Sequence, residues 1–176
     1  PLVSSSAASD VYKRQYPVSH VTGIHLLIIK MYKICSQISW ADVIDKLNHE
    51  FHNNTAINLG TTFVLHNDYR PNTIQKAYDE VLSDEADMHL YVSLTSDSPT
   101  FGKHKDEDDV LIVQAIGSMK YFIENEWVTL VPGEYLYIPK GIYHTPVVLT
   151  PRVTLSFASN TARALNVRSS FGTHDN

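Results

Sequence analysis

Two distant segments of this chain carry side chains that could share one metal ion. His104 and Asp106 stand two residues apart just before the apolar run 110–116, and residues i and i+2 of an extended chain point to the same side. His144 follows a later turn and opens another strand-like run. Two histidines and one carboxylate form the facial triad of non-haem Fe(II) sites, which leaves coordination positions free. We therefore take His104, Asp106 and His144 as candidate catalytic and metal-ligating residues.

The second of these segments resembles a cupin motif. Residues 133–144 read Gly-x5-Pro-x-Gly-x2-His, which matches the second cupin motif through its histidine, although Val148 stands where the motif usually ends in asparagine. The stretches 90–93 and 101–117 resemble the JmjC-type cupins that hydroxylate protein or ribosomal side chains. The likeness covers about residues 88–159.

This resemblance implies an oxygenase that depends on Fe(II) and 2-oxoglutarate. In that family the His-x-Asp pair and the distal histidine hold Fe(II), and 2-oxoglutarate chelates the metal as cosubstrate. The matching residues here are His104, Asp106 and His144. The implied reaction couples decarboxylation of 2-oxoglutarate to hydroxylation of a C–H bond. A protein side chain is the favoured substrate, and small molecules stay open.

The His-x-Asp pair at 104 and 106 can also be interpreted without a metal ion. His104 and Asp106 lie in a turn, 103–109, whose many charged residues favour exposure to solvent. His66 and Asp68 have the same spacing outside the matched motifs, so His-x-Asp alone is not specific. The distance from His104 to the distal motif fits the family, and this favours the ligand interpretation.

One position departs from the family pattern. JmjC-type hydroxylases usually carry Lys or Arg two residues after the glycine that matches Gly117, and this chain has Met119 there. A thioether cannot neutralise a carboxylate. Arg152 and Thr154 are similar to the Arg-x-Ser/Thr of other 2-oxoglutarate oxygenases, which implies that they bind the far carboxylate; an arginine fork suits this task. Lys120 is the second choice, although it should face the other side of its strand. A surface charge is the alternative for Arg152.

Two competing functions remain at this point. The first is a metal-binding cupin without 2-oxoglutarate, either a small-ligand binding module, an isomerase or a simple dioxygenase; Met119 favours it and Arg152 opposes it. The second is a structural cupin that binds nothing, which would require the three ligands to lie apart.

The periodicity of the chain predicts helices followed by strands. Ser39 and Asp42 resemble a capping box, and the apolar residues Val43, Ile44, Leu47 and Phe51 then recur at helical spacing, so we expect a helix over 40–52. A short strand near 61–66 precedes a second helix that Asn72 can cap. Strands are expected at 88–94, 109–116, 119–125, 126–131, 134–139, 144–150 and 152–159. Together with the resemblance, the pattern predicts a mainly β fold, a double-stranded β-helix (cupin or jelly-roll barrel) with two N-terminal α-helices packed on it.

The expected organisation is a single domain with atypical ends. Residues 1–15 look like translated sequencing-adaptor read-through, and 16–30 form an uncertain extension. We assign 31–87 to the helical N-terminal part, 88–159 to the cupin core and 160–176 to a tail.

Charge, hydropathy and cysteine content indicate which binding partners and which cellular compartment to expect. The formal net charge is −5, which argues against a nucleic-acid surface, because such surfaces need clustered Lys and Arg. No apolar run is long enough to span a bilayer, so no membrane is expected. The single cysteine, Cys35, excludes an internal disulfide and is compatible with the cytoplasm. A homodimer remains open, because many cupins pair.

Overall fold

The computed structural model describes residues 35–81 and 87–159. Segments 1–15, 16–30 and 160–176, which the sequence sets apart, lie outside the described residues. No helix within the described part is both long and apolar enough to cross a membrane.

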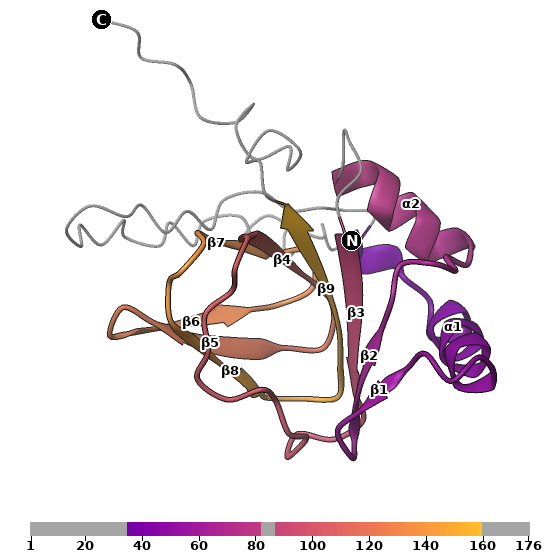
Figure 1. The fold of residues 1–176 in the computed structure, drawn as a ribbon, viewed down its shortest axis with the longest axis horizontal. Coiled ribbons are helices and arrows are strands. Elements are labelled where there is room, and N and C mark those ends of the chain that lie inside the picture. The colour runs from indigo at the N-terminus through magenta and orange to yellow at the C-terminus, as the bar shows by residue number, and fades with distance from the viewer. Residues whose placement is uncertain (1–34, 82–86, 160–176) are drawn as a thin grey trace, which may run out of the picture.

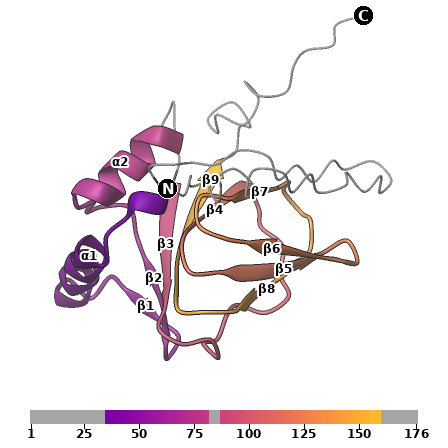
Figure 2. The same ribbon diagram turned by 180° about the vertical axis from the view of Figure 1, so that it is seen from behind.

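Two antiparallel sheets face each other and form the body of the molecule (Figures 1 and 2). The larger sheet has the strand order β1-β2-β3-β9-β4-β7 and the smaller sheet the order β6-β5-β8. Their bounds are β1 (Ile57–Asn58), β2 (Thr62–Leu65), β3 (Asp87–Ser93), β4 (Asp109–Ile116), β5 (Met119–Ile123), β6 (Glu126–Leu130), β7 (Tyr135–Ile138), β8 (His144–Val148) and β9 (Arg152–Ser159). The predicted fold class, mainly β with the helices N-terminal to the strands, is confirmed. The architecture is consistent with a cupin β-sandwich.

Strand β9 of the larger sheet divides its side chains between two environments, because successive residues point to opposite faces. In β9 the apolar residues Val153, Leu155 and Phe157 belong to the core cluster shared with the helices. The intervening residues Arg152, Thr154 and Ser156 line a pocket on the other face. The alternation in this strand therefore separates the structural core from the site.

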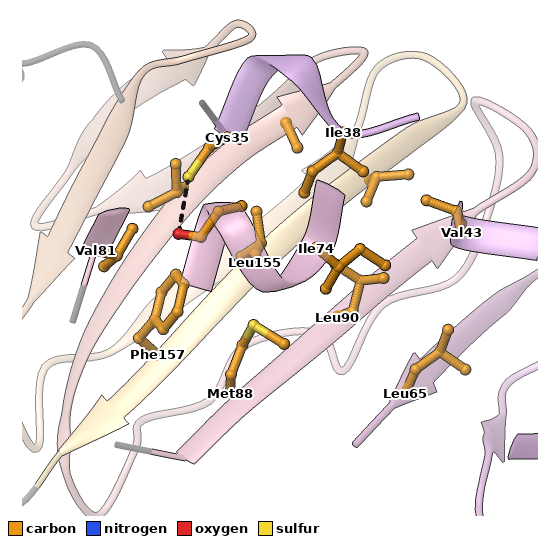
Figure 3. Close-up of a cluster of buried hydrophobic side chains, with 14 of the residues drawn as sticks. Cys35, Ile38, Val43, Leu65, Ile74, Val81, Met88, Leu90, Leu155 and Phe157 are labelled. Carbon is orange, nitrogen blue, oxygen red and sulfur yellow. Dashed lines mark hydrogen bonds between the residues drawn. The ribbon is translucent and has the colours of Figure 1, made fainter. Parts of the chain in front are cut away.

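The helical layer covers the outer face of the larger sheet, beside β2 and β3 (Figure 1). It comprises a 3-10 turn (Cys35–Gln37), α1 (Trp40–His52) and α2 (Asn72–Val81). Figure 3 shows side chains of α2, such as Ile74 and Val81, lying over Leu90 and Phe157 of the sheet, all of them fully buried. Cys35 lies in the same cluster, where its thiol donates to the carbonyl of Ala77 at 3.7 Å. Burial raises the pKa of this thiol, so Cys35 is an inert core residue.

Helix α1 begins where the sequence predicted, but only one of the two hydrogen bonds of the expected capping box forms. The Ser39 hydroxyl accepts from the Asp42 N–H at 3.1 Å. In a complete capping box the Asp42 carboxylate would return to the Ser39 N–H. It instead accepts from the Thr73 N–H at 2.7 Å and from its hydroxyl at 2.5 Å, while the Ser39 N–H donates to the same hydroxyl. The cap therefore joins the starts of the two helices.

The buried face of α1 was predicted incorrectly. Ile44 and Phe51 were expected to pack inward, yet each is 46% exposed. Lys46 and Glu50 are buried in their place and form an ion pair of 2.8 Å. The Lys46 ammonium also donates to the carbonyls of His66 and Tyr69. These backbone acceptors lie beyond the end of β2, and apolar periodicity contains no information about them.

The predicted element boundaries otherwise agree with the structure to within one or two residues, and Asn72 starts α2 as its first helical residue instead of preceding it. The two-residue strand β1 was not predicted. A second apolar cluster fills the space between the two sheets, with Ile112 and Leu136 from the larger sheet and Met119 and Leu130 from the smaller one.

Candidate metal centre

A backbone bridge brings the two candidate histidines together. The His104 N–H donates to the His144 carbonyl at 3.0 Å, and the His144 N–H donates to the His104 carbonyl at 2.8 Å. Residues paired in this way in an antiparallel ladder lie directly opposite each other, with their side chains on one face. The two rings accordingly lie close, with centroids 4.2 Å apart.

The hydrogen bonds of each ring identify which nitrogen is free. Nδ1 of His104 lies 2.9 Å from the Gly102 carbonyl, and Nδ1 of His144 lies 3.2 Å from the Ile142 carbonyl. A carbonyl oxygen only accepts, so each Nδ1 must carry the proton, and each neutral ring keeps its lone pair on Nε2. Backbone carbonyls commonly orient metal-binding histidines in this way.

Asp106 completes the cluster. Its carboxylate oxygens lie 3.9 Å from Nε2 of His104 and 3.6 Å from Nε2 of His144. One ligand atom from each residue lies within 4.8 Å of the others. Two atoms that are each about 2.1 Å from one ion can be at most about 4.2 Å apart, and each of these two distances, one to either carboxylate oxygen, is within that limit. The main-chain carbonyl of Asp106 accepts from the Gly141 N–H at 3.0 Å, which fixes this loop against the second motif.

The three residues of the cluster differ in their exposure to solvent. His144 is 3% exposed, whereas the His104 and Asp106 side chains are 30% and 32% exposed. Burial lowers the pKa of His144, and the proximity of His104 adds to this effect, although the bond to Ile142 and the Asp106 charge oppose it. A histidine that stays neutral is ready to act as a ligand.

The cluster lies in a pocket whose empty volume, including its open mouth, is about 500 Å³. Arg152 lines the same pocket and is 3% exposed. Its Nε donates to the Ser93 hydroxyl at 3.1 Å, and that hydroxyl lies 2.9 Å from the hydroxyl of Thr62. No carboxylate in the described part of the chain pairs with Arg152. A buried guanidinium without a counter-ion is costly unless a ligand supplies the negative charge.

The other two predicted anchor residues lie in different surroundings. Thr154 lines the pocket, but its hydroxyl donates to Gln114 at 2.8 Å. Lys120 is not among the pocket's lining residues, and its ammonium lies over the Trp127 ring, 4.4 Å from the centroid. Met119 is fully buried in the apolar cluster between the sheets.

Tyr121, which lines the pocket, and Gln114, which contacts the pocket residue Thr154, were not singled out by the sequence analysis. Tyr121 is 3% exposed and lines the pocket from β5. Gln114 is fully buried on β4 directly opposite Thr154. Strand alternation could have found Tyr121, because it shares a face with Met119. No sequence signal distinguishes Gln114, since its role depends on the register between β4 and β9.

Asp109 and His66 have partners outside the candidate metal cluster. The Asp109 carboxylate accepts from the Lys140 backbone N–H at 2.9 Å. His66 of the second His-x-Asp pair lies beside Glu50, 3.3 Å from its carboxylate. Among the described residues, only the His104, Asp106 and His144 group meets the geometry of a metal site.

No protein-family model matches the chain, and no curated protein matches it significantly. Among solved structures it is similar to a cupin superfamily protein from Desulfitobacterium hafniense DCB-2, with 14% identity and a TM-score of 0.43 over 58% of this chain and 80% of that one. It is also similar to YcfD, a ribosomal oxygenase from Escherichia coli in complex with cobalt and 2-oxoglutarate, with 20% identity and a TM-score of 0.46. That match covers 60% of this chain and 35% of YcfD. KdgF from Halomonas sp. gives 16% identity and a TM-score of 0.43, over 61% of this chain and 89% of that one.

Proposed function

We propose that this chain is an Fe(II)- and 2-oxoglutarate-dependent oxygenase that hydroxylates a protein side chain. The observation that supports this most is the buried Arg152 guanidinium, which shares one pocket with the His104, Asp106 and His144 cluster. A metal cluster alone fits many cupin functions. A cluster accompanied by a buried cation that no carboxylate of the described residues neutralises fits a ligand that both chelates a metal and carries a distant negative charge.

The donor set fits Fe(II). His104 and His144 would hold the ion through Nε2 and Asp106 through a carboxylate oxygen, and three protein ligands leave positions for a bidentate keto acid and dioxygen. Iron and 2-oxoglutarate, when bound, supply the oxidising chemistry: dioxygen and 2-oxoglutarate give succinate and carbon dioxide, and the substrate C–H becomes C–OH.

The remaining pocket residues position the cosubstrate and limit water. Arg152 binds the carboxylate farther from the metal, because its two terminal nitrogens have no hydrogen-bond partner among the described residues. The apolar side chains of Val110 and Ile112 line the pocket and keep part of it dry. Low dielectric strengthens the attraction between the guanidinium and a carboxylate.

The open mouth supports a side chain of a larger partner as the substrate. His104 and Asp106 are about one-third exposed, and Phe101 at the same pocket is 50% exposed. A side chain carried by a bulky partner can reach ligands placed at a rim. An enclosed site would admit only small molecules.

A second candidate is a metal-binding cupin that does not use 2-oxoglutarate. Met119 favours it, since the family's usual cation is missing at this position. The cost of burying the Arg152 charge without a counter-ion opposes it.

Anaerobic Fe(II) titration with and without 2-oxoglutarate tests the proposal. We expect the weak visible charge-transfer band of an iron–keto acid chelate. The band should be lost in Asp106→Ala and retained in Asp68→Asn, which alters the acid of the matched His-x-Asp pair outside the site. Metal binding without any band at saturating 2-oxoglutarate would support the second candidate, and no metal binding would contradict both.

A further inference from the structure

Two lysine side chains gather around one exposed tyrosine beside the metal ligands. The ammonium groups of Lys103 and Lys105 lie 5.2 Å and 5.6 Å from the centroid of the Tyr143 ring, which is close enough for cation–π attraction. Both lysines are exposed, and Tyr143 is 54% exposed. Among residues 35–81 and 87–159, neither lysine forms an ion pair with an acidic side chain. Both positive charges are therefore available to a partner.

These residues alternate with the metal ligands along two paired segments. Lys103 and Lys105 flank His104, Tyr143 precedes His144, and the two histidines pair across an antiparallel bridge. Successive residues of an extended chain point to opposite faces, so the lysines and the tyrosine lie on the face opposite to the metal cluster. In agreement, none of the three lines the metal pocket. A partner bound on this face is separated from the metal cluster by only one layer of chain.

A hollow next to the lysines is lined in part by apolar and aromatic side chains. Its empty volume, including the open mouth, is about 690 Å³. Phe122 of β5 points away from the core, because Tyr121 and Ile123 on either side of it are buried. No helix of the described residues covers this outer face of the smaller sheet (Figure 1). The hollow can thus take an apolar side chain of a partner. Its lining includes Lys103, Phe122, Glu124, Ile142, Tyr143 and Thr145.

The charges on this surface favour a partner with a few separated negative charges. The chain as a whole carries a formal net charge of −5, so only a local group of cations can attract an acidic partner. Glu124 lines the same hollow, and Glu107 follows Lys105 by two residues. A continuous phosphate backbone would lie against these acids, and nucleic-acid surfaces need clustered Lys and Arg. A protein segment can instead place its carboxylates at the lysines and an apolar side chain in the hollow.

We infer that this surface docks an acidic segment of the protein substrate, in which two carboxylates lie two residues apart next to an apolar side chain. Lys103 and Lys105 have the same i, i+2 spacing, so a Glu-x-Glu pair in an extended peptide can meet both of them. The apolar side chain enters the hollow, and another residue of the same partner reaches the metal pocket past its open rim. This inference rests on the proposed function, because it describes the partner that carries the hydroxylated side chain.

Fluorescence anisotropy of rhodamine-labelled peptides with the Mn(II)-loaded full chain tests the inference without measuring turnover. The probe peptide carries Glu-Gly-Glu followed by leucine, and a second peptide carries Gln-Gly-Gln in its place. We expect the glutamate peptide to bind about 5-fold more tightly, because each exposed ion pair contributes a modest factor. The difference should shrink as the salt concentration rises.

Single substitutions locate the binding surface. Lys103→Gln and Lys105→Gln should each weaken binding of the glutamate peptide by about 2- to 5-fold and leave binding of the glutamine peptide unchanged. Lys76→Gln is the matched control, because it removes one exposed lysine charge from α2 in the helical layer. It should bind both peptides as the unaltered chain does.

A change in the hollow separates its contribution from that of the lysines. Phe122→Ala should weaken binding of the leucine-containing peptide by roughly 3-fold, because apolar contact is lost. A peptide with serine in place of leucine should bind equally to both proteins. Circular dichroism verifies that each variant is folded, and Mn(II) titration verifies that its metal cluster is intact.

The outcomes distinguish the docking surface from the proposed function. If the iron–keto acid band forms while the glutamate and glutamine peptides bind equally, or Lys76→Gln weakens binding as much as Lys103→Gln, the docking surface is refuted and the proposed function stands. A single-stranded RNA that binds through the same lysines more tightly than the peptide also overturns the inference. If the peptides behave as expected and no band forms with 2-oxoglutarate, the docking surface is supported and the oxygenase proposal fails.

Discussion

The position of one proton on each imidazole prepares His104 and His144 for metal binding. Carbonyl oxygens hold Nδ1–H on both rings, so both lone pairs face Asp106 before any ion arrives. A ligand set ordered in advance loses little conformational entropy on binding. The same arrangement places His144 in a setting where a positive charge is unfavourable.

The buried position of His144 predicts a pH dependence of stability. Its pKa is lowered from an ordinary value of 6.5, mainly by burial, so below that pH the unfolded chain binds more protons than the folded one. The free energy of unfolding should therefore decrease as pH falls from 6.5 through the lowered pKa. Urea denaturation of the metal-free chain between pH 7 and 5 measures this slope. His144→Gln should show a smaller slope, and an equal slope in both proteins would contradict the assignment.

At the scale of elements, the turn between β4 and β5 joins the two sheets and depends on a glycine. Gly117 has φ +70°, a region that L side chains rarely adopt. An added Cβ would collide with the Pro151 carbonyl oxygen and lie 2.6 Å from the Thr150 hydroxyl. The close approach to residues 150–151 places the turn before β5 directly against the turn before β9.

Gly117→Ala should therefore destabilise the fold by roughly 3 kcal/mol, the sum of a backbone cost and a clash. Gly60→Ala is the matched control, because Gly60 has φ +85° and no heavy atom within 4 Å of the added Cβ. It should cost only about 1 kcal/mol. Chemical denaturation of both variants measures the difference. Similar losses would mean that the contact with Pro151 relaxes freely.

At the scale of the whole molecule, the metal cluster connects two parts of the fold. His144 opens β8 of the smaller sheet, and Asp106 lies in the segment that leads into β4 of the larger sheet. An ion bound by both would link the sheets across the pocket. Because the unfolded chain separates these ligands, metal binding favours the folded state.

Metal should consequently raise the melting temperature. At 100 times its dissociation constant, Mn(II) adds about 2.7 kcal/mol, which corresponds to a shift of roughly 5–15 °C for a domain of this size. Differential scanning fluorimetry with and without a chelator measures the shift. Asp106→Ala should show none of it, and a full shift in that variant would place the binding site elsewhere.

The sequence by itself determined the local features of this protein. Strand alternation, helical periodicity and turn residues act over a few positions, so the bounds of α1 and of most strands could be predicted. The i, i+2 spacing of His104 and Asp106 likewise placed both side chains on one side of the chain.

Only the tertiary structure decided what depends on contacts between distant segments. The His104–His144 bridge, the bond from Thr154 to Gln114 and the burial of Lys46 with Glu50 each join residues whose own neighbours in sequence say nothing about the partner. The physical reason is that strand register and helix docking follow from the packing of the whole core. A shift of one residue in β9 would turn Arg152 away from the pocket and into the apolar layer.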